Sequence, residues 1–307
     1  MLTSFFGKSS PLNFLLVSIY VLFISLGYYF GNSEGSFVLT EMLSFVFTLG
    51  ILIFSMFVLD FTIRKNGLTL INTYDILLFS CAAMMLSMLM PASQIVISNL
   101  FLLLAMRRVF SLQSFKNNER KILDASLWIA IASVFYFWSL LFVVALYIAI
   151  SLKPQKSVRY FLIAPVTFFG IFLVATAYHY IHEDSFGWFV NWLGDVSFQF
   201  SPYSDIRILI FLTFIGSLLI WTVFSKIASI SAAPKKDRPN QILSLYVLLV
   251  CLMISLLCPE KTGAEFLFFL APAAIIFAGY IEKKTEVWFK EILLWVFVLI
   301  PLIFIWI

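Results

Sequence analysis

Charged residues are scarce in this sequence. Asp, Glu, Lys and Arg make up 12% of its 307 residues, whereas hydrophobic residues make up 62% and the mean hydropathy is +1.03. An ordinary soluble domain carries about 25% charged residues, so the composition excludes one. The chain is predicted to be an all-α polytopic membrane protein. Its net charge of +4 is informative only through the positions of the basic residues.

The sequence also lacks the motifs of several enzyme classes. Its three cysteines, Cys81, Cys251 and Cys258, all lie in apolar runs, so neither a disulfide framework nor a metal knuckle follows from them. It contains no Walker phosphate loop, no dinucleotide-binding glycine fingerprint and no nucleophile elbow. No internal repeat of fixed period is present either, so a transporter built from two inverted halves gains no support.

Ionisable residues are rare within the apolar runs. Asp60 ends the second run beside Arg64, Asp75 lies one or two turns inside the third, and Asp124 is expected to pair with Arg120. Because charge in hydrocarbon is costly and normally functional or paired, this scarcity argues against an ion-coupled pump with a charged relay and against a voltage sensor. It leaves open a carrier for an amphipathic lipid.

What the sequence does contain is a series of apolar runs long enough to cross a membrane. A spanning helix needs about 20 mostly apolar residues, and no soluble domain fits between these runs. We therefore treat 1–307 as a single integral membrane domain, with a front module 1–224, a cytoplasmic linker 225–241 and three last spans in 242–307. The runs are 12–30, 38–60, 68–90, 92–106, 122–152, 160–178, 206–224, 242–258, 265–281 and 292–307.

The basic residues predict the sidedness of these runs. With the N-terminus inside, the cytoplasmic segments hold 18 of the 20 Lys and Arg residues, and only Arg207 and Lys261 lie outside. Lys and Arg concentrate in the cytoplasmic loops of membrane proteins. The sequence thus predicts a multi-pass protein of the cell inner membrane with a cytoplasmic N-terminus and an external C-terminus.

The run 122–152 has basic segments on both sides, so this orientation requires it to begin and end in the cytoplasm. Its 31 residues give about 46 Å of helix, too much for one crossing and too little for two. We predict a short helical hairpin that turns near Tyr136 to Ser139, with the turn facing the bundle interior. The hairpin brings the total to about 11 membrane helices. The alternative is one long tilted helix that breaks the rule of basic cytoplasmic loops.

Residues 99–150 read NLFLLLAMRRVFSLQSFKNNERKILDASLWIAIASVFYFWSLLFVVALYIAI: an apolar helix, an arginine pair, a basic loop and a short helical pair. This block resembles the middle of the membrane-embedded glycosyltransferases of the GT-C superfamily. The whole chain, including its opening MLTSFFGKSSPLNFLL, is similar to an uncharacterised family of multi-span proteins from Bacteroidota. The first resemblance implies a GT-C-like fold and a lipid-linked sugar as substrate. The second implies no chemistry.

The first external segment departs from the GT-C pattern. Those enzymes usually place an acidic catalytic residue, often an acidic pair, in a long first external loop, and here the segment is only GNSEGSFVLTE. It offers Glu34 and Glu41 without an adjacent pair. The resemblance implies a general-base role for one of the two. Alternatively, Glu41 starts a helix, where a carboxylate is favoured by the helix dipole.

Both histidines of the chain fall in one stretch, followed by two acidic residues. His179 and His182 share a helix face at i and i+3, so together with Asp184 they are a candidate site for a divalent metal. Zinc needs three or four protein ligands, and the helical two-histidine motif has i, i+4 spacing. The alternative is a span that emerges into the head-group region with aromatic and polar residues. No cofactor is expected by default.

An aromatic stripe follows the histidines. Trp188, Phe189, Trp192 and Val196 recur at roughly helical spacing, which is typical of a helix that lies in the outer interface. Such a helix either flanks a lipid substrate or packs against the protein.

Arg207 and Lys261 are the basic residues of the predicted external side and the candidates for binding a phosphate head group. The alternative for Arg207 is an ion pair with Asp205 or Asp184 at the interface.

Two main functions are compatible with these observations. The first is a non-catalytic cell-envelope assembly subunit or lipid-handling scaffold with a GT-C-like fold, which the missing acidic pair favours. The second is a glycosyltransferase that depends on a polyprenyl-phosphate-linked sugar, and a lipid transporter is a further alternative. Membrane lipids are the expected partners, with a polyprenyl-phosphate-linked substrate or other envelope proteins as further ones. No nucleic acid is expected.

Overall fold

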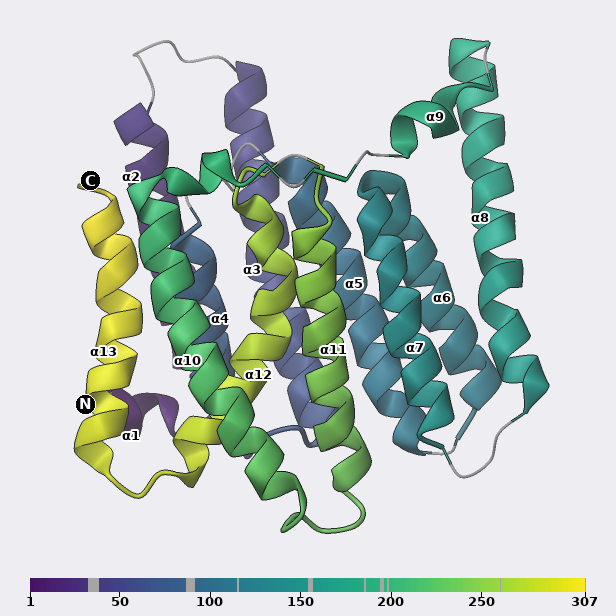
Figure 1. Cartoon of the computed structure of the whole chain (residues 1–307). Helices are drawn as coiled ribbons and strands as arrows, with labels where there is room; N and C mark the ends of the chain where they lie inside the picture. The colour runs from purple at the N-terminus through teal and green to yellow at the C-terminus, as the bar shows by residue number, and fades with distance from the viewer. Residues whose placement is uncertain are drawn as a thin grey trace.

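The apolar runs form helices because a backbone in hydrocarbon must satisfy its own N–H and C=O groups within the segment. The computed structural model describes residues 1–32, 39–86, 92–114, 116–153, 157–184, 186–193, 196–197, 199–259 and 261–306. Within them lie thirteen α-helices (Figure 1): α1 (Leu2–Phe6), α2 (Pro11–Asn32), α3 (Leu39–Asn66), α4 (Tyr74–Met84), α5 (Ser93–Ser111), α6 (Asn118–Phe135), α7 (Phe142–Ser151), α8 (Val158–Glu183), α9 (Trp188–Trp192), α10 (Ile206–Ile230), α11 (Arg238–Leu256), α12 (Leu267–Lys283) and α13 (Val287–Phe304).

Eight helices of the described part are long and apolar enough to cross a membrane. They are α2, α3, α5, α8, α10, α11, α12 (counted from Ala264) and α13. The protein is therefore a polytopic membrane helix bundle, as predicted. The expected total of about 11 membrane helices is not reached by this measure, because α4 has 11 residues, α7 has 10, and α6 begins with four polar residues.

The run 122–152 folds as two helices that lie side by side and run in opposite directions (Figure 1). Helix α6 ends at Phe135, and Tyr136 adopts an extended conformation with φ −148° and ψ 105°. A 3₁₀ turn, η3 (Phe137–Leu141), then leads into α7. The Tyr136 ring packs on Phe268 of α12, with 5.1 Å between the ring centroids. The break and its inward-facing turn agree with the prediction, although α6 begins one turn earlier than the apolar run.

Neighbouring elements donate hydrogen bonds to two carbonyl groups at the end of α6. Ser98 Oγ of α5 donates to the Ala132 carbonyl at 3.1 Å, and Trp192 Nε1 of α9 donates to the Ser133 carbonyl at 2.5 Å. The Ala132 carbonyl also accepts from the Tyr136 amide at 3.0 Å, so the bond to the Ser133 carbonyl is the one that replaces a bond lost at the helix end. Both bonds allow the chain to turn while it stays buried.

Helix α12 is the centre of the bundle. It packs against α4, α5, α10 and α11, and nearly all of its residues are buried. Its sequence is rich in alanine, which lets neighbouring helices approach closely where no hydrophobic effect drives their association. The small residues are Ala271, Ala273, Ala274 and Ala278.

The helix directions group the basic residues at one end of the bundle, which we call the basic end. The N-termini of α2, α4, α6, α8, α11 and α13 and the C-termini of α3, α5, α7, α10 and α12 lie there, whereas the C-terminus of the chain lies at the opposite end (Figure 1). In or between these helix ends lie Lys8, Arg64, Lys65, Arg107, Arg108, Lys116, Arg120, Lys121, Lys153, Arg159, Lys226, Lys235, Lys236, Arg238, Lys283, Lys284 and Lys290.

The linker expected at 225–241 is shorter than predicted. Helix α10 continues to Ile230 and α11 already begins at Arg238. Serine and alanine after Lys226 are compatible with helix, and Pro239 fits the first turn of α11, where a missing N–H removes no bond.

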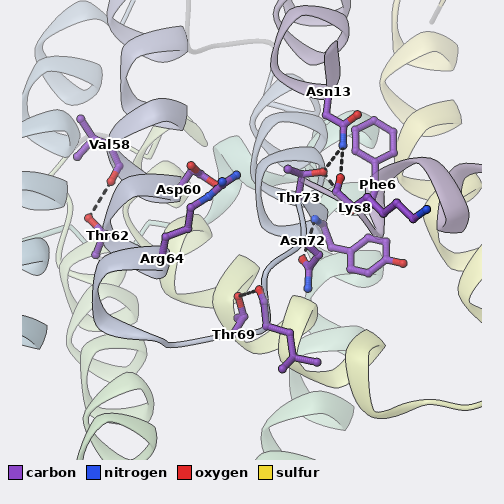
Figure 2. A network of polar contacts seen from close by, with 12 residues as sticks. Phe6, Lys8, Asn13, Val58, Asp60, Thr62, Arg64, Thr69, Asn72 and Thr73 are labelled. Carbon is purple, nitrogen blue, oxygen red and sulfur yellow. Dashed lines mark hydrogen bonds and ion pairs between the residues drawn. The ribbon is translucent and has the colours of Figure 1, made fainter. Parts of the chain in front are cut away.

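Polar contacts at the basic end tie the N-terminal segment to α4 (Figure 2). Asn13 Nδ2 of α2 donates to Thr73 Oγ1 at 2.6 Å and to the Lys8 carbonyl at 2.8 Å, and the Thr73 amide donates to the Phe6 carbonyl at 2.9 Å. These residues are far apart in sequence, so the network fixes the turn between α1 and α2 against the start of α4.

Two ion pairs are present among the described residues, both at the basic end. Arg64 Nε lies 2.7 Å from Asp60 Oδ1 within α3 (Figure 2), and an Arg108 nitrogen lies 2.8 Å from Asp124 Oδ2 between α5 and α6. The expected pairing of Asp124 with Arg120 is therefore wrong. The close packing of α5 on α6 brings Arg108 to the carboxylate, which a rule based on spacing within one helix does not foresee.

Lys153, just after α7, is a buried cation whose removal is expected to stabilise the protein. Its side chain is 2% exposed, and its Nζ has no hydrogen-bond partner among the described residues. Burial, and secondarily the charge of Lys121, lowers the pKa of the Lys153 ammonium to about 8. Below that pH both the folded and the unfolded states carry the proton, so the burial penalty is complete at pH 7.

We expect Lys153→Met to raise the free energy of unfolding at pH 7 by roughly 1–2 kcal/mol, a value reduced for solvent screening. Because the unfolded lysine holds its proton to higher pH, the wild type should gain stability between pH 8 and about 10.5. The variant should lack that gain. Thermal unfolding in detergent at several pH values measures both effects, with the exposed Lys116→Met as control. A parallel pH profile in wild type and variant would contradict the assignment.

Candidate functional site

The candidate catalytic carboxylates are not assembled into a site by the described residues. Glu34 lies outside the described residues. Glu41 lies in the first turn of α3 and is exposed, which agrees with the alternative of a carboxylate at a helix start. A general-base role for either residue stays a prediction.

The two candidate phosphate-binding cations are engaged differently from the expectation. Lys261 is buried, its Nζ donates to the Leu256 carbonyl, and its charge lies 5.5 Å from the ring centroid of Phe200. Arg207 is half-buried at the start of α10, and its backbone N–H donates to Asp205 Oδ1 at 2.8 Å. Asp205 therefore caps the helix and forms no side-chain ion pair with Arg207 in the described structure. Phosphate binding by these cations stays a prediction.

The histidines pack against aromatic rings. The His179 ring stacks on Trp188 at 5.0 Å between centroids, whereas His182 lies 4.6 Å from the ring of Tyr178. Asp184 is exposed and ends α8 in the left-handed conformation. The described residues contain no group of three His, Cys, Asp or Glu side chains that is able to hold a metal ion. A metal site at His179, His182 and Asp184 stays a prediction.

Two residues of the aromatic stripe, Trp188 and Trp192, pack on the protein, whereas Phe189 and Val196 are exposed. Trp188 is buried between His179 and Trp192, and Trp192 reaches the hairpin, where its ring lies 4.8 Å from that of Phe137. Helix α9 is therefore a short brace between α8 and the hairpin. Because α8 lies on the side of the bundle away from α10 (Figure 1), the histidines and Arg207 do not share one pocket.

A buried carboxylate lies at the opposite end, at the start of the central helix. Glu265 belongs to the 3₁₀ turn η5 (Ala264–Phe266) and is completely buried. Its Oε1 accepts a short hydrogen bond from Tyr203 Oη, and its Oε2 accepts one from Thr262 Oγ1 at 3.2 Å. Ser255 Oγ of α11 donates to its backbone carbonyl at 2.7 Å. The carboxylate thus joins Tyr203 to the start of the central helix, and the backbone carbonyl of the same residue joins that turn to α11.

A groove lies at the basic end, and we call it the α10–α13 groove. It has a volume of about 720 Å³ and lies between α10, the end of α12 and the start of α13. Apolar and aromatic side chains form most of its wall, and two lysines lie where α12 ends. The lining residues are Phe214, Ser217, Leu218, Trp221, Tyr280, Lys283, Lys284, Thr285, Glu286, Phe289 and Leu293.

Aromatic groups hold the polar part of this groove in place. Trp221 Nε1 donates to Tyr280 Oη at 2.6 Å, and Lys284 Nζ lies 4.8 Å from the centroid of the Tyr280 ring. Lys283 Nζ donates to Ser229 Oγ at 2.8 Å. Indole and phenol groups beside lysines are typical of protein surface at lipid head-group depth. The groove therefore offers an apolar trough that ends in the two positive charges of Lys283 and Lys284 and the single negative charge of Glu286.

A smaller pocket adjoins the groove. It has a volume of about 320 Å³ and lies between the loop after α3, the end of α10, the start of α11 and the end of α12. Lys283 belongs to the lining of both cavities.

The model of DUF6427, described as a family of unknown function, matches residues 8–307. The chain belongs to this family. No curated protein and no solved structure matches it. The similarity of the whole chain to an uncharacterised multi-span family is thereby confirmed, whereas the GT-C resemblance of residues 99–150 gains no support.

The groove of this DUF6427 member was missed by the sequence reasoning. In the sequence, Lys283 and Lys284 indicate only which side of the membrane their loop lies on. Trp221 and Tyr280 lie 59 positions apart, so the sequence does not show that they are in contact. One signal was available: a tryptophan near the end of one apolar run and a tyrosine followed by two lysines near the end of another mark interfacial ends. That signal does not tell which runs are neighbours.

Proposed function

We propose that this DUF6427 member is a lipid-handling protein of the inner membrane that holds an anionic phospholipid in the α10–α13 groove. The observation that carries the proposal is the combination of an apolar trough between helices and two lysines at its end. Acyl chains fill the trough, and the phosphate lies beside Lys283 and Lys284. A catalytic role is not part of the proposal.

The position of the groove supports a membrane ligand. Trp221 and Trp288 are more than 60% exposed beside it, so this part of the surface contacts lipid rather than other helices of the chain. The negative charge of a phosphate is complementary to the two lysines of the groove, which lie beside aromatic rings. The charge complementarity favours a phospholipid over an uncharged lipid.

The proposal includes an orientation. With the basic end in the cytoplasm, the N-terminus is cytoplasmic, the C-terminus is external and the groove opens to the inner leaflet. Anionic lipids give the cytoplasmic leaflet a negative surface potential, which attracts lysines near it. The hairpin α6–α7 and the short helix α4 then lie within the bundle without completing separate crossings, so that eleven helices occupy the membrane.

Binding of phosphatidylglycerol to the purified protein tests the proposal. Each lysine near a phosphate contributes about 1 kcal/mol, so Lys283→Gln with Lys284→Gln should weaken binding about 30-fold. Native mass spectrometry or a titration in detergent measures the change. The matched control is Lys235→Gln with Lys236→Gln, two exposed lysines in the loop at the same end of the bundle. Equal loss in both double variants would leave only unspecific charge attraction and would overturn the proposal.

A further inference from the structure

Two cations from different helices meet on one phenylalanine ring at the basic end. Lys65 Nζ of α3 lies 5.4 Å from the centroid of the Phe61 ring, and the guanidinium carbon of Arg107 of α5 lies 4.5 Å from it. Lys65 is exposed, Phe61 is 45% exposed and Arg107 is half-buried, so the group is open to a ligand from outside. We call these three residues the α3–α5 site. Helix α5 lies right of the centre in Figure 1, whereas α10 and α13 lie at the left, so this site is separate from the α10–α13 groove.

The carboxylates next to the α3–α5 site are bound by other arginines. Asp60 is bound by Arg64 within α3. The charge of Asp124 acts on Arg107, but its Oδ2 is bound by Arg108. The two cations of the site form no ion pair among the described residues. They are therefore able to attract an anion.

Lys121, at the start of α6, extends this positive region. It lies close enough to Lys65 and Arg108 for their charges to repel one another. Glu119 and Arg120, which precede it, are exposed and add one charge of each sign. The positive region thus continues from α3 across α5 to α6, so it offers cations to more than one phosphate.

An exposed stripe of phenylalanines leads along α3 to the α3–α5 site. Phe47, Phe54 and Phe61 follow one another at seven-residue spacing, which places them on one face of the helix. Their exposed fractions are 58%, 53% and 45%. Within a membrane, such a face contacts either acyl chains or the helix of another protein.

The charges favour a lipid over a second copy of this chain. In a symmetric contact, both copies present the same surface at the same membrane depth. Lys65 and Arg107 of one copy would then meet the same cations of the other, and like charges repel. A phospholipid has no such conflict, because its chains cover the phenylalanines and its phosphate is attracted to the cations.

We infer that the α3–α5 site binds the head group of a phospholipid that carries two phosphates, as cardiolipin does. One phosphate lies between Lys65 and Arg107, the second lies toward Lys121, and acyl chains lie along the phenylalanine stripe. Basic surface between membrane helices is the kind of site that recognises such head groups. The α10–α13 groove offers less positive charge, because Glu286 offsets one of its two lysines, and it suits a single phosphate. The inference is independent of the proposed function, since the two sites share no residue.

Binding of cardiolipin and phosphatidylglycerol with matched acyl chains to the purified protein tests the inference. Native mass spectrometry distinguishes the two lipids by mass. Lys65→Gln with Arg107→Gln should weaken cardiolipin binding about 30-fold, because it removes two cations beside a phosphate, and should leave phosphatidylglycerol in the groove unchanged. Lys283→Gln with Lys284→Gln should have the reverse effect. Lys235→Gln with Lys236→Gln is the matched control and should change neither. Exposed Lys65→Gln alone should weaken cardiolipin binding about fivefold, which keeps the test valid if the double variant fails to fold.

The outcomes separate this inference from the proposed function. Equal loss of cardiolipin in the Lys65/Arg107 variant and in the Lys235/Lys236 control would leave only unspecific charge attraction and would overturn the inference. Loss of cardiolipin in the Lys283/Lys284 variant alone would place this lipid in the groove, which overturns the inference and supports the proposed function. Inorganic pyrophosphate should not displace cardiolipin. Displacement would assign the site to a soluble phosphate and would also overturn the inference.

Discussion

Replacing Glu265 with alanine should lower the free energy of unfolding by about 2–4 kcal/mol, because it leaves buried hydrogen-bonding groups without partners. The carboxylate is completely buried and joins Tyr203 and Thr262 to the start of α12. Its loss leaves the buried Tyr203 hydroxyl without its acceptor. Since α12 is the central helix, the damage reaches the whole bundle rather than one loop.

Unfolding by heat or denaturant in detergent micelles measures this effect. Tyr203→Phe removes only one partner and should cost less, about 1–2 kcal/mol. The double variant should be less destabilised than the sum of the two single changes, because the groups are in contact. Glu286→Ala, an exposed acidic residue just before α13, is the matched control and should stay within about 0.5 kcal/mol of the wild type. An unchanged midpoint in Glu265→Ala would show that the carboxylate does not hold α12 in place.

Cysteine labelling should show which loops lie on which side of the membrane, and each position should react either fully or not at all from a given side. The native cysteines Cys81, Cys251 and Cys258 are buried, so they give little background. In spheroplasts, a charged maleimide should label Ser204→Cys but not Lys116→Cys, because a charged reagent does not cross the hydrocarbon core of the membrane. Lys116→Cys should react only after the membrane is opened.

The same reporter chemistry tests the hairpin. Lys116 precedes α6 and Arg159 follows α7, and both side chains are exposed. If α6 and α7 return to the side from which they came, cysteines at these two positions label together. Labelling of Lys116→Cys and Arg159→Cys from opposite sides would mean that the segment crosses the membrane once, and the proposed orientation of the groove would then fail as well.

Much of the helix layout was predictable from the sequence, because a membrane helix needs a minimum apolar length and basic residues mark its ends. The break in the hairpin falls at Tyr136, where the prediction placed it, since the flanking charges left too few residues for two full crossings. The linker was predicted too long because its serine and alanine residues are weakly polar yet form helix readily. The positions of the helix ends and of the hairpin break depend on local charge and segment length, so they are predictable without any tertiary contact.

The site was much less predictable. The residues selected from sequence, such as Arg207 and His179, lie on separate parts of the bundle, and Lys261 is already bound to a backbone carbonyl. Asp124 found its partner on α5 instead of on its own helix. In each case the sequence identified a charged or polar residue, and the packing of the helices determined which group it contacts.

The amino-acid sequence by itself determined that this chain is a membrane protein, roughly where its helices begin and end, and which helix ends belong together. Only the tertiary structure decided that α12 is central and that α10 and α13 leave a groove beside it. The reason is that lipid chains and protein interior are about equally apolar, so hydrophobicity does not distinguish a face that meets lipid from a face that meets another helix. Close packing of side chains from distant segments makes that distinction.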